Sequence, residues 1–181
     1  WAQARVAAEA MQTPSVGWDR TGDTVEVSDQ VAEHAGYFVA ETVTLRHPTF
    51  SGGMSDSITR ETFVAADAAI VLPYDPVRDR ILLVEQFRMG PWRRGAAFPW
   101  MLEPVAGRID PGETAEDCVR REAEEEAGLH LRDLLVVGTG YPTPGYSTEY
   151  FHIFCGLCDL PDGVEGHHGQ ADEHEDIRTH V

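Results

Sequence analysis

Alternation of apolar and polar residues predicts strands in the first third of the chain. The alternation covers residues 37–46 and 57–65, and Pro48, Gly52 and Gly53 lie between the two runs. Proline and glycine clustered in this way indicate a turn or loop. We therefore expect a small antiparallel sheet at this end of the chain.

The apolar pattern of the remaining chain predicts a second region of strands with one clear helix. Apolar runs typical of strands cover residues 68–73, 81–84, 100–105, 134–138 and 150–158. The first two flank a turn-forming segment and predict a hairpin, whereas the segment around Trp92 and Phe98 is expected to be a loop. A helix is expected over residues 114–127, where Thr114 can cap the first turn and Gly128 can end the last. Strands, one helix and more strands in this order favour a mixed sheet with helices packed on it.

Composition excludes several classes of function. The chain has 181 residues with 14 basic and 31 acidic side chains, a formal net charge of −17, and arginine as its only strongly basic residue. Without lysine, the chain lacks the phosphate-binding residue of a P-loop and the amine of Schiff-base chemistry. Its acidic balance disfavours nucleic-acid binding, because a phosphate backbone attracts a basic surface. A phosphate-bearing substrate still fits if a divalent cation supplies the positive charge.

The length of the apolar runs and the number of cysteines indicate the cellular compartment. No apolar run is long enough to span a membrane, and the stretch 1–11 is typical of a short helix rather than a signal peptide. Cys118, Cys155 and Cys158 are too few for a disulfide framework and fit a reducing compartment. The last two form a CxxC without two further zinc ligands at suitable spacing, and we interpret them as core residues. We expect a cytoplasmic protein with neither a nucleic-acid nor a membrane partner.

The predicted helix carries acidic residues on the face that should pack against the protein. At about 100° per residue, one face holds Ala115, Cys118, Val119, Glu122 and Glu126. Glu125 lies at the edge of this face. Carboxylates on a packed face repel one another and lose hydration, so they need positive partners. Arg121 can neutralise part of this charge, and a hard divalent cation, which prefers oxygen ligands, would neutralise the rest.

The helix is the central part of a longer pattern of single residues. This pattern consists of Gly107, Glu113, Arg121, Glu122, Ala123, Glu125, Glu126, Gly128 and Leu129. This pattern resembles the Nudix box, and on this basis the chain resembles the Nudix hydrolase family. Ala123 stands where a bulkier aliphatic residue is usual, and the ADP-ribose branch of the family tolerates alanine there.

Several shorter stretches are similar to the bacterial ADP-ribose pyrophosphatases of that family. They cover residues 60–61, 72–79, 84–88, 102–107, 142–149 and 171–178. Pro144, which follows the box, matches the family's marker for ADP-ribose hydrolysis. The resemblance implies an α+β fold, namely a Nudix α/β/α sandwich with a mixed sheet. Residues 66–181 would form this domain, and we expect its closing helix to be missing after Val181. Residues 1–65 would form an N-terminal extension whose antiparallel sheet dimerises, so a homodimer is expected.

The resemblance also implies a metal centre and a catalytic base. Glu122, Glu125, Glu126 and the carbonyl group of Ala106 would hold two or three Mg²⁺ or Mn²⁺ ions, with Glu122 and Glu126 counted as catalytic. The metals would neutralise a diphosphate and lower the pKa of the attacking water. Glu173 matches the loop glutamate that acts as base, and its neighbour Glu175 remains an alternative.

The same resemblance supplies a set of substrate-binding residues. Arg60 and Arg88 match residues that hold the phosphates and the terminal ribose, which suits the planar fork of arginine. Tyr37 stands where the family has an aromatic ring that reaches from the partner subunit and stacks on adenine. Glu61 and Pro144 complete the set. The plain alternatives are surface ion pairs for the two arginines and an ordinary strand aromatic for Tyr37.

The function implied is metal-dependent hydrolysis of ADP-ribose, or of a related nucleoside diphosphate sugar, to AMP and ribose 5-phosphate. GDP-mannose or another nucleotide sugar is the alternative substrate within the same chemistry. A non-catalytic sensor that binds a nucleotide sugar and an acidic metal binder without a substrate are the alternatives from other classes. The sensor is disfavoured because it has no need of a catalytic base.

Overall fold

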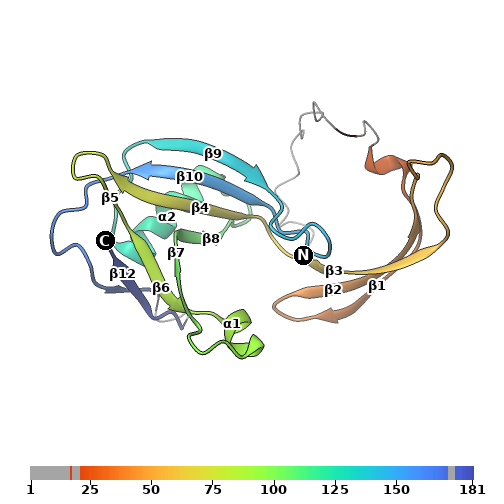
Figure 1. Ribbon diagram of the computed structural model, residues 1–181, viewed down its shortest axis with the longest axis horizontal. Coiled ribbons are helices and arrows are strands. Elements are labelled where there is room, and N and C mark those ends of the chain that lie inside the picture. Colours follow the sequence, from red (N-terminus) through yellow and green to blue (C-terminus); the bar gives the residue numbers. More distant parts are fainter. Residues whose placement is uncertain (1–16, 18–20, 171–173) are drawn as a thin grey trace. The chain divides into compact units, whose positions relative to one another are not determined.

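The computed structural model describes residues 17, 21–170 and 174–181, which form two compact units (Figure 1). The first unit combines the described residues up to Ala66 with the segment Tyr141–Glu149, and the second combines Asp67–Gly140 with Tyr150–Val181. The stretch 1–11, for which we expect a helix, lies outside the described residues. Among the helices that are described, none has both the length and the apolar character needed to cross a membrane.

The first unit contains a three-stranded antiparallel sheet in the order β1-β2-β3. Its elements are the short 3-10 helix η1 (Gly22–Thr24), β1 (Glu26–Ala35), β2 (Val39–Arg46) and β3 (Ile58–Val64). The two strands expected from alternation correspond to β2 and β3, whereas β1 is not predicted. The sequence of β1, EVSDQVAEHA, has polar residues on both faces of the strand, so it does not show the regular apolar stripe that alternation detects, and all ten residues are exposed.

The segment Tyr141–Glu149 pairs with the edge strand β3. The backbone N–H of Phe63 donates to the carbonyl of Tyr146 over 2.7 Å, and the N–H of Thr148 donates to the carbonyl of Phe63 over 3.0 Å. The hydroxyl of Thr148 also donates to the carbonyl of Ala65, a residue 83 positions away along the chain. These bonds explain why the segment belongs to the first unit despite its distance in sequence.

The second unit contains two sheets. One has the order β5-β4-β10-β9, with β8 also paired to β4, and the other has the order β11-β12-β6-β7. Strands β4 and β10 run parallel and the other pairings are antiparallel, which confirms the expected mixed sheet. The strands are β4 (Ala68–Asp75), β5 (Arg80–Ile81), β6 (Leu83–Phe87), β7 (Trp100–Glu103), β8 (Val105–Arg108), β9 (Leu134–Gly140), β10 (Phe151–Leu157), β11 (His167–His168) and β12 (Ile177–His180).

Two of the predicted strands divide between these sheets. The run 81–84 was expected to pair with β4 as one arm of a hairpin, but only its start lies in β5, and Leu83 begins β6 in the other sheet. The run 100–105 divides at Pro104 into β7 and β8, because proline has no N–H to donate to a ladder. The segment around Trp92, expected to be a loop, forms the six-residue helix α1 (Met89–Arg94).

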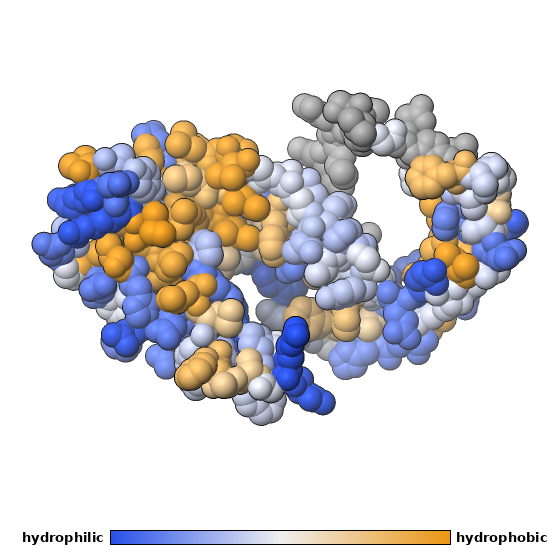
Figure 2. Space-filling model, viewed as in Figure 1, coloured by the Kyte–Doolittle hydropathy of each residue, from blue (hydrophilic) through white to orange (hydrophobic). Residues whose placement is uncertain are grey.

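The core of the second unit lies between the sheets and the long helix α2 (Ala115–Ala127), which contacts β4 and β8. Its fully buried side chains include Leu82, Val71, Val84, Val105, Val119, Leu160 and Ile177. Cys118 and Cys158 are buried free thiols and Cys155 is half-buried, which supports the interpretation of the CxxC as core. By contrast, apolar side chains gather on an exposed face over β9 and β10 (Figure 2).

Candidate active site

Helix α2 begins and ends where its capping residues predict. The hydroxyl of Thr114 accepts the N–H of Asp117 over 3.1 Å, and Gly128 ends the helix in the left-handed conformation with φ +63°. Asp117, Arg120 and Glu124 are exposed. The buried residues of the helix are Cys118, Val119, Ala123, Glu126 and Ala127. One glutamate therefore lies within the packed face.

Glu126 is this buried carboxylate, with an exposed fraction of only 2%. Its Oε2 accepts the backbone N–H of Ala106 over 3.2 Å, and its Oε1 accepts the side-chain amide of Gln86 over 3.5 Å. Burial raises the pKa of Glu126 to about 8, because the charged form loses hydration. Gln86 was not anticipated, since it comes from β6 and no local motif links it to the helix.

Arg121 connects three carboxylates beside Glu126. Its guanidinium lies 2.9 Å from Glu113, 2.7 Å from Glu122 and 3.0 Å from Glu125. The hydrogen bond from Arg121 lowers the pKa of Glu113, whereas burial raises the pKa of Glu122. Arg121 thus balances part of the negative charge, as the sequence indicates, and holds the glutamates at the end of β8.

Gly107 allows β8 to approach this cluster closely. A Cβ placed on Gly107 would lie 2.6 Å from Cγ of Glu122 and would overlap its carboxylate. Any side chain at this position would therefore displace Glu122 from its place beside Arg121. Close approach of backbone to a functional group is a common reason for glycine.

The donor set suits a hard divalent cation in its chemistry. Three carboxylates lie on one side of α2, and burial raises the pKa of the most buried of them, Glu126. Hard cations prefer such oxygen ligands. Within the described ranges, however, no three acidic, histidine or cysteine side chains are arranged as a complete metal site. Arg121 pairs with Glu122 and Glu125, and Ala106 donates to Glu126.

Three other expected site residues belong to the sequence of the second unit: Glu173, its alternative Glu175, and the substrate-binding residue Arg88. Glu173 lies outside the described residues. Glu175 lies within the described residues. Burial is the main cause that raises the pKa of Glu122 and of Glu126, and the negative charge of Glu175 raises both in the same direction. Arg88 follows β6 and forms an ion pair with Glu103 over 2.7 Å. That ion pair matches the plain alternative for Arg88, and its substrate role stays a prediction.

The remaining predicted binding residues belong to the first unit. Tyr37 is 69% exposed, with its ring edge-on to Phe38, and Arg60 is an exposed residue of β3 whose guanidinium donates to the carbonyl of Thr59. Pro144 lies in the exposed turn of the segment that pairs with β3. The structure therefore assigns these residues to the first unit, with Arg60 in β3, Tyr37 in the bend between β1 and β2 and Pro144 in a turn, whereas the acidic helix belongs to the second unit.

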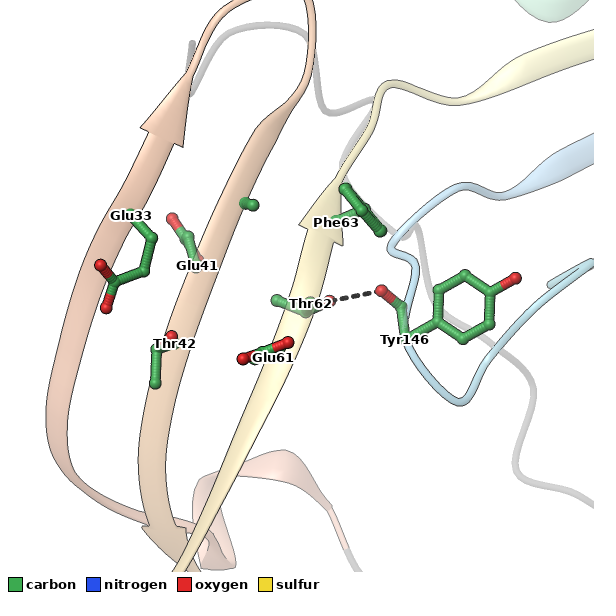
Figure 3. Close-up of a pocket in the computed structure, with 8 residues that line it drawn as sticks. Glu33, Glu41, Thr42, Glu61, Thr62, Phe63 and Tyr146 are labelled. Atoms are coloured by element: carbon green, nitrogen blue, oxygen red, sulfur yellow. Dashed lines mark hydrogen bonds between the residues drawn. The ribbon is translucent and has the colours of Figure 1, made fainter. Parts of the chain in front are cut away.

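Glu61 lines a pocket of about 650 Å³ on the sheet of the first unit (Figure 3). Carboxylates of Glu33, Glu41 and Glu61 lie along it, and the rings of Phe63 and Tyr146 stand at its end, 6.4 Å apart in an edge-to-face arrangement. The hydroxyl of Thr62 in β3 donates to the carbonyl of Tyr146 over 3.1 Å, and this bond connects the segment that carries Tyr146 to the strand. Tyr146 is a lining residue that sequence reasoning missed, because its pairing with Phe63 is non-local.

Comparisons with known proteins agree on the type of domain. The family model described as "NUDIX domain" matches residues 64–180. The ADP-ribose pyrophosphatase of Escherichia coli K12 is 42% identical over 157 residues, which cover 87% of this chain and 74% of that protein. The enzyme of the same name from Haemophilus influenzae is 36% identical over 159 residues, with shares of 87% and 73%.

Two further similarities are more distant. The GDP-mannose pyrophosphatase of Citrobacter koseri is 31% identical over 120 residues, which cover 66% of this chain and 61% of that protein. The crystal structure of an ADP compounds hydrolase superposes with a TM-score of 0.64 at 21% identity, covering 87% of this chain and 77% of that one. At that identity the superposition supports the fold alone.

Proposed function

Since this chain belongs to the Nudix family, we propose that it is a pyrophosphohydrolase that cleaves ADP-ribose to AMP and ribose 5-phosphate. Relatives named ADP-ribose pyrophosphatase, which align with 87% of the chain, support this substrate. The observation that carries the proposal is the acidic face of α2, where the buried Glu126 lies beside Glu122 and Glu125. Such a concentration of carboxylates is suited to a cationic centre that grips a diphosphate.

Enzymes of this family generally depend on divalent metal. We propose Mg²⁺ or Mn²⁺, in two or three copies, held by Glu122, Glu125, Glu126 and the carbonyl of Ala106. When bound, the metal would supply charge neutralisation for the diphosphate and would acidify a water molecule. Arg121 would keep the carboxylates oriented, since it already contacts two of them.

The proton of the attacking water needs an acceptor from the chain. We propose Glu173 as this base, with Glu175 as the alternative. Glu175 is supported by its pairing with Gln170, which follows directly on Gly169, whose N–H donates to the carbonyl of Glu125 in α2. A carboxylate close to the reacting water is suited to general base catalysis.

Substrate binding is proposed for Arg60, Arg88, Glu61, Tyr37 and Pro144. Arg60 is exposed on β3 and offers its guanidinium to a phosphate or ribose. The pocket beside Glu61 has two aromatic rings at its end and a volume that suits a nucleoside. We further propose that the first unit's sheet mediates a homodimer, and that the enzyme acts in a reducing, cytoplasmic compartment, as its three free cysteines support.

The proposal is tested by supplying purified protein with ADP-ribose and Mg²⁺ or Mn²⁺ and measuring the release of AMP. We expect ADP-ribose to be turned over faster than GDP-mannose or other ADP-sugars in the same panel. Glu126→Gln should reduce kcat by several orders of magnitude while the circular dichroism spectrum is retained. Absence of AMP release with either metal would refute the substrate, and binding without turnover would favour the sensor.

A further inference from the structure

Gly169 lies in a backbone conformation that only glycine adopts with ease. Its φ is +104°, and a Cβ added there would lie 2.9 Å from Cβ of Glu175 and 3.0 Å from the carbonyl oxygen of Glu175. The carbonyl belongs to the backbone and cannot rotate aside as the end of a long side chain could. Any other residue at position 169 would therefore push the backbone of Glu175 away.

Glu175 is held at this place by its partner Gln170. The N–H of Glu175 donates to the carbonyl of Gln170 over 3.1 Å, and Oε2 of Glu175 accepts the N–H of Gln170 over 3.2 Å. Gly169 immediately precedes this pair, and its own N–H donates to the carbonyl of Glu125 in α2 over 3.4 Å. Gly169 thus links the acidic helix to the backbone that carries Glu175.

We propose that Gly169 is a positioning residue that sets the place of the Glu175 carboxylate beside the acidic face of α2. The placement follows from the backbone, because Gly169 is bonded to the Glu125 carbonyl of α2 and the adjacent Gln170 is bonded to both the N–H and the carboxylate of Glu175. The activity readout of this proposal rests on the proposed hydrolase function, whereas its stereochemical basis does not.

Gly163 offers a matched control in the same unit. Its φ of +81° is also positive, but a Cβ added there meets nothing within 4 Å. Gly163→Ala therefore imposes a similar backbone strain without a collision, and Gly169→Ala imposes both. A difference between the two variants isolates the contact with Glu175.

The activity test compares kcat and KM for the wild type, the two alanine variants, Glu175→Gln and the double variant of residues 169 and 175. We expect Gly169→Ala to lower kcat by ~10–100-fold, because small misplacements of a functional group are costly, with little change in KM. Gly163→Ala should stay within about threefold of the wild type. The double variant should be no slower than Glu175→Gln, since residues that act through one another are not additive.

A second readout does not need activity. Amide exchange measured by NMR at Gln170 and Glu175 should be faster by roughly tenfold or more in Gly169→Ala than in Gly163→Ala, because the displaced backbone loses its reciprocal bonds. Gly169→Asn keeps the Cβ but tolerates positive φ better, so it should reproduce the alanine effect if collision rather than strain is the cause.

Three results would overturn the inference: wild-type kcat in Glu175→Gln, additive losses in the double variant, or equal amide exchange in the two alanine variants. If the wild type hydrolyses no nucleoside diphosphate sugar, the proposed function fails. The exchange comparison alone then decides whether Gly169 positions Glu175.

Discussion

Replacement of Gly107 by alanine should separate stability from activity at the acidic cluster. The added methyl group would overlap the Glu122 carboxylate, and the contacted atoms belong to the far end of a flexible side chain. Glu122 can rotate away at modest cost, so we expect the free energy of unfolding to fall by about 1 kcal/mol, the low end for overpacking. The rotation would break the 2.7 Å pair with Arg121 and remove Glu122 from the place where a cation would be held.

The expected consequence is a loss of turnover much larger than the loss of stability. We predict that kcat for AMP release falls by at least ~100-fold, because a displaced ligand or orienting group impairs catalysis far more than folding. Urea denaturation and steady-state kinetics at saturating Mn²⁺ provide the two measurements. Gly138→Ala is the matched control, since Gly138 lies in β9 and its added Cβ meets nothing within 4 Å.

Two outcomes would refute this reasoning. If Gly107→Ala kept kcat within about threefold of Gly138→Ala, the observed position of Glu122 would be irrelevant to the reaction. If the variant lost stability by much more than overpacking explains while the kcat of its folded fraction was normal, Gly107 would serve the fold rather than the site.

Three further predictions test the charges and the core. Arg121→Ala leaves three carboxylates without their partner and should lower the free energy of unfolding by about 1–3 kcal/mol. Millimolar Mn²⁺ should raise its melting temperature more than that of the wild type, and an equal rise would contradict a cation site there. Asp75 is buried, and the N–H of Leu160, the guanidinium of Arg78 and the N–H of Val77 hold its pKa well below the usual value. A carboxylate whose pKa is lowered by folding stabilises the folded state above its unfolded pKa of about 3.9, and this stabilisation is lost as the pH falls. The melting temperature of the wild type should therefore exceed that of Asp75→Asn by less at pH 3 than at pH 7. A constant difference would argue against the ionised form. Leu160→Ala should cost about 2–5 kcal/mol in chemical denaturation because Leu160 is fully buried, whereas a loss below about 1 kcal/mol would show that the site collapses without a cavity.

The sequence alone determined the features that depend on neighbours along the chain. The bounds of α2 follow from the Thr114 hydroxyl and from Gly128, which act within one turn of the helix. Helical periodicity likewise predicts that Glu126 lies on the packed side, and the box pattern indicates the family. Strands β2, β4 and β10 were expected because one face of each is apolar and at least partly buried.

Only the tertiary structure decided what depends on residues far apart in the chain. Alternation could not predict β1, because its sequence has polar residues on both faces and shows no regular apolar stripe. The division of strands between sheets at Pro104 and the pairing of Tyr146 with Phe63 depend on which partner each backbone finds. The same holds at the site, where Gln86 and Ala106 come from two different sheets to hold one carboxylate of α2. Helix caps and periodicity are local, whereas strand pairing and burial are set by contacts that sequence spacing does not encode.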